Sequence, residues 1–100
     1  EGPVECVIRE FQEELDVSIE VSRLVHTTET FIPSAFKKLE QVIAIHYLVT
    51  SNDAIASMES TQPTRLGGEN YHLFEWCTLN PELLDKLTFE MDRQALSRLM

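Results

Sequence analysis

Apolar side chains recur at helical spacing near the start of the chain. Five of them follow the i, i+3, i+4, i+7 pattern that lines one face of an α-helix: Val4, Val7, Ile8, Phe11 and Leu15. Pro3 suits the first helical turn, because the N–H that proline lacks has no partner there. Asp16 stands where the helix should end, since Asp tolerates the left-handed backbone better than most residues. The pattern predicts a helix over residues 3–15.

β-Branched residues dominate the next segment, residues 19–30, and predict one extended strand or two strands with a bend near residues 22–23. Pro33 and Ser34 interrupt this pattern. The strongest strand signal follows over residues 39–50, where apolar side chains alternate onto both faces. We therefore expect this strand to be sandwiched between two layers.

The remaining segments are a polar stretch, a third strand and two helices. Residues 51–70, with Pro63, Gly67 and Gly68, predict a long loop, with a short helical piece near residues 53–58 as an option. Strand character returns over residues 71–78. Asn80 resembles an N-cap, with Pro81 opening a helix to about Leu87, and residues 92–99 form a weaker helical candidate. The order predicts one α+β domain over residues 1–100, with hairpin-like strand pairing.

Charge and composition narrow the class of protein. Seventeen acidic against eight basic residues give a formal net charge of −9, which disfavours a nucleic-acid scaffold. A phosphate-bearing substrate would be repelled unless cations intervened. No apolar run has the length of a membrane span, and no signal peptide is visible. Cys6 and Cys77 are too few and too far apart for a zinc site, so we expect free thiols and a cytoplasmic location.

Three carboxylates are expected to converge on the first helix. Glu10, Glu13 and Glu14 stand at i, i+3 and i+4, on a patch about 120° around the helix from the apolar stripe. Their mutual repulsion would be cancelled by a divalent cation, and Mg²⁺ prefers such hard oxygen ligands. The alternative is an ordinary solvated acidic face, which is what most charge clusters are.

The order of residues around these carboxylates resembles the catalytic box of the Nudix hydrolase family. Glu1 is followed after seven residues by Arg9-Glu10-Phe11-Gln12-Glu13-Glu14-Leu15-Asp16-Val17. The family pattern is Gly, five residues, Glu, seven residues, Arg-Glu, an apolar residue, any residue, Glu-Glu, any residue, Gly and an apolar residue. Two departures stand out: the first Gly of the box with its five following residues is absent, and the closing Gly is Asp16.

The resemblance implies a Nudix-like α/β/α sandwich with a mixed sheet, here lacking its N-terminal strands. It also implies an enzyme that hydrolyses the pyrophosphate bond of a nucleoside diphosphate linked to another group, with Mg²⁺ or Mn²⁺ as cofactor. Glu13 and Glu14 would then be metal ligands, Glu10 a ligand or the general base, and Glu1 a further ligand or a brace for its loop. Arg9 would orient a neighbouring glutamate, the alternative being a surface salt bridge.

Family members often take a further catalytic glutamate from outside the box, and Glu40 is the candidate here, with an ordinary surface role as its alternative. His46 lies in an apolar strand and is expected to be a core histidine with a satisfied ring rather than a ligand. Two rivals to the enzyme remain: a non-catalytic Nudix-fold binding or regulatory module, and a truncated remnant. A second copy of the chain, forming a homodimer, would cover a sheet edge left exposed by missing strands.

Overall fold

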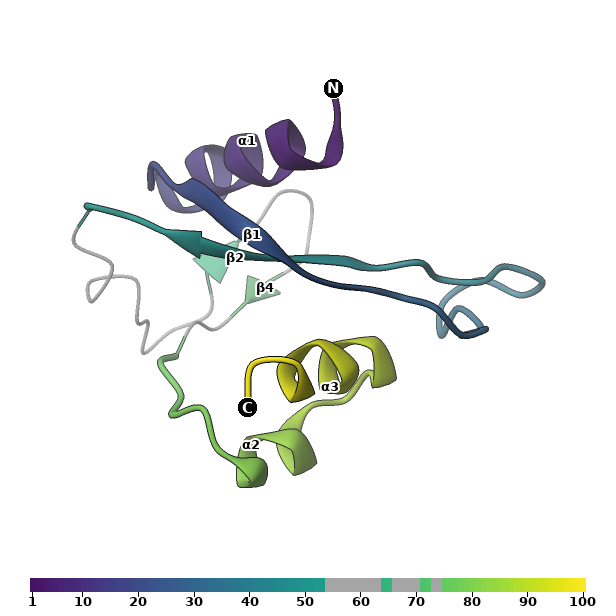
Figure 1. Cartoon of the computed structure of the whole chain (residues 1–100). Coiled ribbons are helices and arrows are strands. Elements are labelled where there is room, and N and C mark those ends of the chain that lie inside the picture. Colours follow the sequence, from purple (N-terminus) through teal and green to yellow (C-terminus); the bar gives the residue numbers. More distant parts are fainter. Residues whose placement is uncertain (54–63, 66–70, 73–74) are drawn as a thin grey trace. The chain divides into compact units, whose positions relative to one another are not determined.

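The computed structural model describes residues 1–53, 64–65, 71–72 and 75–100, which form the helices and short strands of a small α+β protein (Figure 1). The elements are, in chain order, α1 (Pro3–Leu15), β1 (Glu20–Thr27), β2 (Ile45–Thr50), β3 (Thr64–Arg65), β4 (Tyr71–His72), α2 (Pro81–Lys86) and α3 (Glu90–Ser97). The chain divides into two compact units. The first comprises Glu1–Val21 and Val49–Cys77, and the second comprises Ser22–Leu48 and Thr78–Met100. The prediction of an α+β fold is confirmed.

Helix α1 has the predicted boundaries because both of its ends are specified locally. Pro3 occupies the first turn, and Asp16 ends the helix in the left-handed conformation, with φ 53° and ψ 41°. The amides of Asp16 and Val17 turn back to the carbonyls of Gln12 and Phe11, at 3.1 and 3.3 Å. These bonds satisfy carbonyls that a helix end otherwise leaves without partners. Val17 and Ile19, which follow directly, are buried in the first unit.

Residues 20–27 form the single strand β1, so the alternative of two strands with a bend near residues 22–23 is wrong. Strand β1 pairs with β2 in an antiparallel sheet. The prediction of a strand over residues 39–50 is wrong in its first half, because β2 begins only at Ile45. The chain between the two strands still pairs, but irregularly. The amide of Thr28 bonds the carbonyl of Ala44, whereas further out the amide of Val42 bonds the carbonyl of Ile32.

The irregularity comes from a change of register. Three residues lie between Thr28 and Ile32, but only one lies between Val42 and Ala44, so two extra residues bulge from the first segment. At the point where the ladder breaks, the hydroxyl of Thr28 takes the place of a backbone acceptor and receives the amide of Ala44 at 2.9 Å. The two segments then pair again through an isolated bridge between Pro33 and Gln41. Regular strand structure therefore stops at Thr27 and resumes at Ile45.

Two further predictions of the first unit need correction. Within the expected loop over residues 51–70, β3 pairs with β4 in antiparallel register, with Thr64 opposite His72 and Arg65 opposite Tyr71. The strand expected over residues 71–78 is regular only at Tyr71–His72, since residues 75–78 join no strand ladder of the described chain and are exposed. The helical piece considered near residues 53–58 lies, except for Asp53, outside the described residues.

The C-terminal helices belong to the second unit and match their sequence signals. The Asn80 side chain accepts a hydrogen bond from the amide of Leu83 at 3.1 Å, so Asn80 is the predicted N-cap. Helix α3 starts two residues before the predicted position, with Glu90 and Asp92 in a first turn that favours negative charge. Ala95, Leu96 and Ile32 are the buried apolar residues of this unit. None of the helices in the described part of the chain is long and apolar enough to cross a membrane.

Candidate active site

Arg9 joins two of the glutamates that the sequence singled out. Its Nε lies 3.0 Å from both carboxylate oxygens of Glu1, and its Nη2 lies 2.6 Å from Glu1 Oε1. Its Nη1 donates to Oε2 of Glu13, one helical turn further on, at 2.8 Å. The planar guanidinium is well suited to such forked bonding. Arg9 thus tethers the residues before the helix to its third turn, and whether these contacts orient a functional carboxylate or are surface salt bridges stays a prediction.

The electrostatics of this network follow from its geometry. The hydrogen bonds from Arg9 lower the pKa of the Glu1 carboxyl below its usual value, and those same bonds raise the pKa of Arg9. Both side chains are substantially exposed, at 44% for Arg9 and 37% for Glu1, so solvent screens the attraction. The network therefore contributes little to the stability of the fold.

Cys6 lies beside the same carboxylates, a contact that the sequence reasoning missed. Its Sγ is 3.7 Å from Glu10 Oε1 and 3.7 Å from Arg9 Nη2. Partial removal from solvent, and then the negative charges of Glu10 and Glu1, raise the pKa of this thiol. A protonated thiol can donate to Glu10. The signal was available, since Cys6 and Glu10 are four residues apart on a helix. Cys6 and Cys77 are both free, as predicted.

The donor set on α1 has the chemistry that Mg²⁺ or Mn²⁺ requires, because all of its members are exposed carboxylates with hard oxygens. Among the described residues, however, no three His, Cys, Asp or Glu side chains converge closely enough to hold a metal ion. Glu13 points one oxygen at Arg9, and Glu14 makes no hydrogen bond to another described residue. Binding of a metal by Glu10, Glu13 and Glu14 therefore requires these exposed side chains to rotate towards one another.

Glu40, the candidate from outside the box, belongs to the second unit, whereas the α1 glutamates belong to the first. It lies in the turn between β1 and β2, where its carbonyl accepts the amide of Ser34 at 2.8 Å. Its side chain is exposed and makes no hydrogen bond within the described chain. Its catalytic role stays a prediction.

Two histidines of the second unit have partners on α3 that no sequence pattern indicated. Nε2 of His46 lies 2.9 Å from Asp92 Oδ1, and Nε2 of the buried His26 lies 3.3 Å from Gln94 Oε1. The expectation of a satisfied ring for His46 holds for Nε2 and is wrong for Nδ1, which is buried without a partner in the described chain. Because 46 and 68 residues separate these partners, local spacing carried no signal for them.

Two clefts are lined by residues other than the predicted site residues. One, of about 230 Å³ in the first unit, is lined by Ser18, Ile19, Glu20, Thr50, Ser51, Asn52 and Asp53. Across this cleft, the amide of Ser18 donates a hydrogen bond of 2.7 Å to the carboxylate of Asp53. The other, of about 300 Å³ in the second unit, is lined by His26, Glu29, Thr30, Gln94, Ser97 and Arg98. Neither cleft includes a residue of the Nudix-like box among its lining.

Comparison with known proteins yields no relative: no family model matches the chain. No curated protein and no solved structure matches it either. Function must therefore be argued from the residues of α1 themselves.

Proposed function

We propose that this chain is part of a metal-dependent hydrolase that cleaves the pyrophosphate bond of a nucleoside diphosphate linked to another group. The proposal includes a Nudix-like arrangement of helices around a mixed sheet. It rests on one observation: Glu1 and the Arg-Glu and Glu-Glu pairs of α1 keep the spacing of such a box, and Arg9 connects Glu1 with Glu13 as an orienting residue of such a site would.

The distribution of side chains around α1 supports this proposal, because apolar and acidic residues lie on different faces. Its apolar stripe is half-covered at Val7, Phe11 and Leu15, while its glutamates face solvent. A helix that needed only stability would place lysines among these glutamates, because like charges at i, i+4 spacing are unfavourable. Arg9 pairs with Glu13, but Glu10 and Glu14 are like charges at i, i+4 spacing with no ion pair in the described chain, a cost that a bound cation would remove.

In the proposed reaction, Glu10, Glu13, Glu14 and Glu1 would hold a divalent cation. That cation, when bound, neutralises phosphate charge and lowers the pKa of a coordinated water. Glu10 would otherwise accept the proton of the attacking water, and Glu40 is a second candidate for that base. Arg9 holds Glu1 and Glu13 in place, and the Cys6 thiol donates to Glu10. This division of roles also explains how a chain of net charge −9 would bind an anionic substrate.

The direct test is release of phosphate or nucleotide from a panel of nucleoside diphosphate compounds, with and without Mg²⁺. Glu14→Gln is the sharpest variant, because Glu14 makes no hydrogen bond or ion pair within the described chain and its loss should leave the fold intact. We expect metal-dependent turnover by the parent chain and a loss of about 10²–10⁴-fold in kcat for Glu14→Gln.

Glu5→Gln is the matched control, since Glu5 is an exposed glutamate of the same helix outside the proposed site. It should retain parental turnover. Absence of metal-dependent turnover on every compound, or equal activity of the parent and Glu14→Gln, would instead favour a non-catalytic binding module.

A further inference from the structure

An apolar face of the second unit lies uncovered on the arm between β1 and β2, here defined as residues 28–44. In Figure 1 the arm appears as two adjoining segments that extend from these strands and are closed by a turn. The Pro33–Gln41 bridge sets its register. One residue closer to the base, the amide of Val42 bonds the carbonyl of Ile32 at 2.8 Å. Phe31, at the end of the bulge, and Ile43 adjoin this pair, and alternation along each segment places both on the face opposite Ile32.

The two faces of the arm differ in cover. Ile32 is 7% exposed on one face, whereas Phe31 and Ile43 are 73% and 64% exposed on the other. Ile45, two residues beyond Ile43 on the same face, is 43% exposed. The alternation of apolar residues along the second segment predicted a layer against each face, and the second unit supplies a layer to one face only. A two-stranded ribbon with an uncovered apolar face is marginal by itself in water.

The turn that closes the arm carries two exposed apolar side chains, Phe36 and Leu39. Leu39 has a positive φ of 64°, which is costly for a bulky residue, and its side chain is fully solvated. Phe36 is 86% exposed, and its ring lies tilted beside that of Phe89 with centroids 6.1 Å apart. Backbone strain that holds an apolar side chain in water points to contact with another molecule.

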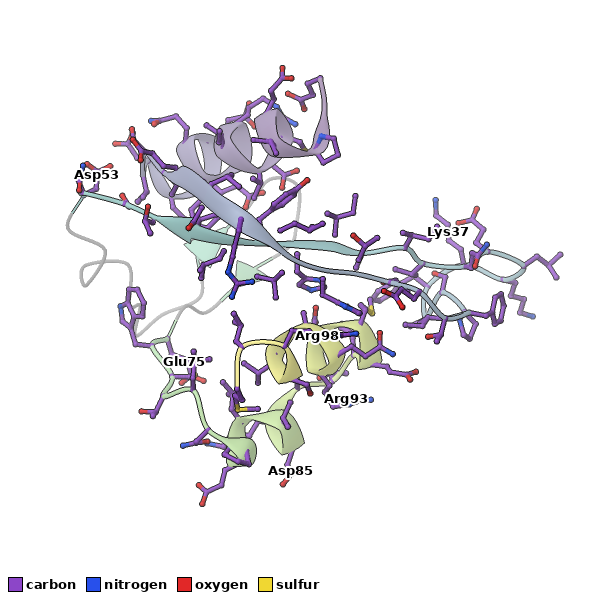
Figure 2. The ribbon with its side chains drawn as sticks, in the orientation of Figure 1. Lys37, Asp53, Glu75, Asp85, Arg93 and Arg98 are labelled. Atoms are coloured by element: carbon purple, nitrogen blue, oxygen red, sulfur yellow. The ribbon has the colours of Figure 1, made fainter. Side chains whose placement is uncertain are left out.

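The net charge of the arm indicates which molecule covers its exposed apolar face. The arm contains Lys37 and Lys38 against Glu29 and Glu40, so its net charge is zero, and the rest of the chain carries the whole −9. Two copies of so acidic a chain repel one another least where their neutral segments meet. Lys37, labelled in Figure 2, and Lys38 lie in the turn together with Glu40, which leaves the turn with a charge of +1, while Glu29 follows Thr28 at the base of the arm. Antiparallel arms would therefore bring opposite charges together.

We propose that this chain forms a symmetric dimer in which the arms of two copies pack face to face through Phe31, Ile43 and Ile45. Such an interface uses the same patch on both copies, as a two-fold axis requires. Leu39 of each copy then lies over the base of the other arm. The second copy supplies the layer that the apolar pattern of residues 39–50 demands.

Sedimentation equilibrium of the full chain over a range of concentrations tests this proposal. We expect the parent to sediment as a dimer at micromolar concentration, and Phe31→Ser with Ile43→Ser to weaken the dimer by at least about 100-fold. Leu39→Gly should also weaken it while leaving the monomer folded, because glycine relieves the positive φ. Lys37→Glu with Lys38→Glu should weaken it most at low salt.

Leu79→Ser is the control, since Leu79 is 55% exposed in the same unit but outside the arm. It should leave the dimer unchanged. A parent that sediments as a monomer at every concentration overturns the proposal, and so does an equal effect of Leu79→Ser. A monomer that co-sediments with phosphatidylserine vesicles through Phe36 and Leu39 would overturn it too, by assigning the turn to a lipid surface.

Discussion

The left-handed residue that ends α1 offers a quantitative test of how this helix is terminated. Asp16 adopts φ 53° and ψ 41°, and its Oδ1 accepts a 2.7 Å hydrogen bond from the side chain of Gln12. The family pattern has Gly at this position. Substituting Gly, Asn and Ala in turn separates the backbone requirement from the side-chain bond and from the charge.

Three effects decide the outcome at this position. Glycine removes a left-handed penalty of roughly 1–2 kcal/mol but loses about 0.5–1 kcal/mol of conformational entropy, so its net backbone effect is a gain of about 0.5–1 kcal/mol. Loss of the Gln12–Asp16 bond costs about 0.2–0.5 kcal/mol. Removal of a negative charge from the C-terminal end of a helix gains about 0.3–1 kcal/mol. Asp16→Gly should therefore stabilise the chain by about 1 kcal/mol. Asp16→Ala loses the Gln12 bond and raises the backbone penalty, because Asp tolerates the left-handed conformation better than Ala, so it should be slightly destabilising.

Thermal unfolding followed by circular dichroism measures these differences. About 1 kcal/mol corresponds to a shift of about 4–8 °C in Tm for a domain of this size. We expect the order Gly, Asn, Asp, Ala from highest to lowest Tm. If Asp16→Ala unfolds at the same temperature as Asp16→Gly or above it, the left-handed end of α1 is not what limits this helix.

Three further predictions concern the arm, the Arg9 network and α2. Thr28→Val removes the hydroxyl that accepts a hydrogen bond from the partly buried amide of Ala44, so it should lower the free energy of unfolding by about 1–3 kcal/mol in urea titrations. Thr30→Val, at an exposed position, should have little effect. Arg9→Gln should raise the pKa of the Glu1 carboxyl towards its ordinary value in an NMR titration, because the guanidinium bonds that lower it are lost. Because the pKa of Glu1 is lowered in the folded state, the Arg9–Glu1 pair stabilises the fold above the ordinary carboxyl pKa, and this stabilisation is lost as pH falls through the lowered value. Identical acid-unfolding profiles of the parent and Arg9→Gln would contradict this sign. Asn80→Ala should lower Tm by about 4–8 °C, because it deletes an N-cap bond worth about 1 kcal/mol, and an unchanged Tm would show that Pro81 alone starts the helix.

The elements that could be predicted from the sequence are those whose ends are set by local chemistry. Pro3 and Asp16 bound α1, and Asn80 with Pro81 starts α2, because capping involves residues only a few positions apart. The start of β2 could not be predicted in this way. It depends on the hydroxyl of Thr28 and on a register change between segments sixteen residues apart, neither of which alters the apolar alternation.

In the candidate site, too, contacts between residues on one helix could be predicted from the sequence, and the other contacts could not. The bond between Arg9 and Glu13 follows from helical spacing, and the spacing of the box placed Glu10 and Glu14 beside it. The bond from Arg9 to Glu1 crosses the start of the helix, where periodicity gives no direction. The partners of His26 and His46 lie on α3, far along the chain, so only the folded structure brings them together.

Anomalous diffraction from crystals soaked in Mn²⁺ tests most directly whether the glutamates of α1 bind a divalent cation. We expect an anomalous peak within about 2.0–2.6 Å of carboxylate oxygens from Glu10, Glu13 and Glu14, and its loss in Glu14→Gln. Manganese bound elsewhere, for example at Asp53 and Glu20 in the cleft of the first unit, with none on α1, would contradict the proposal.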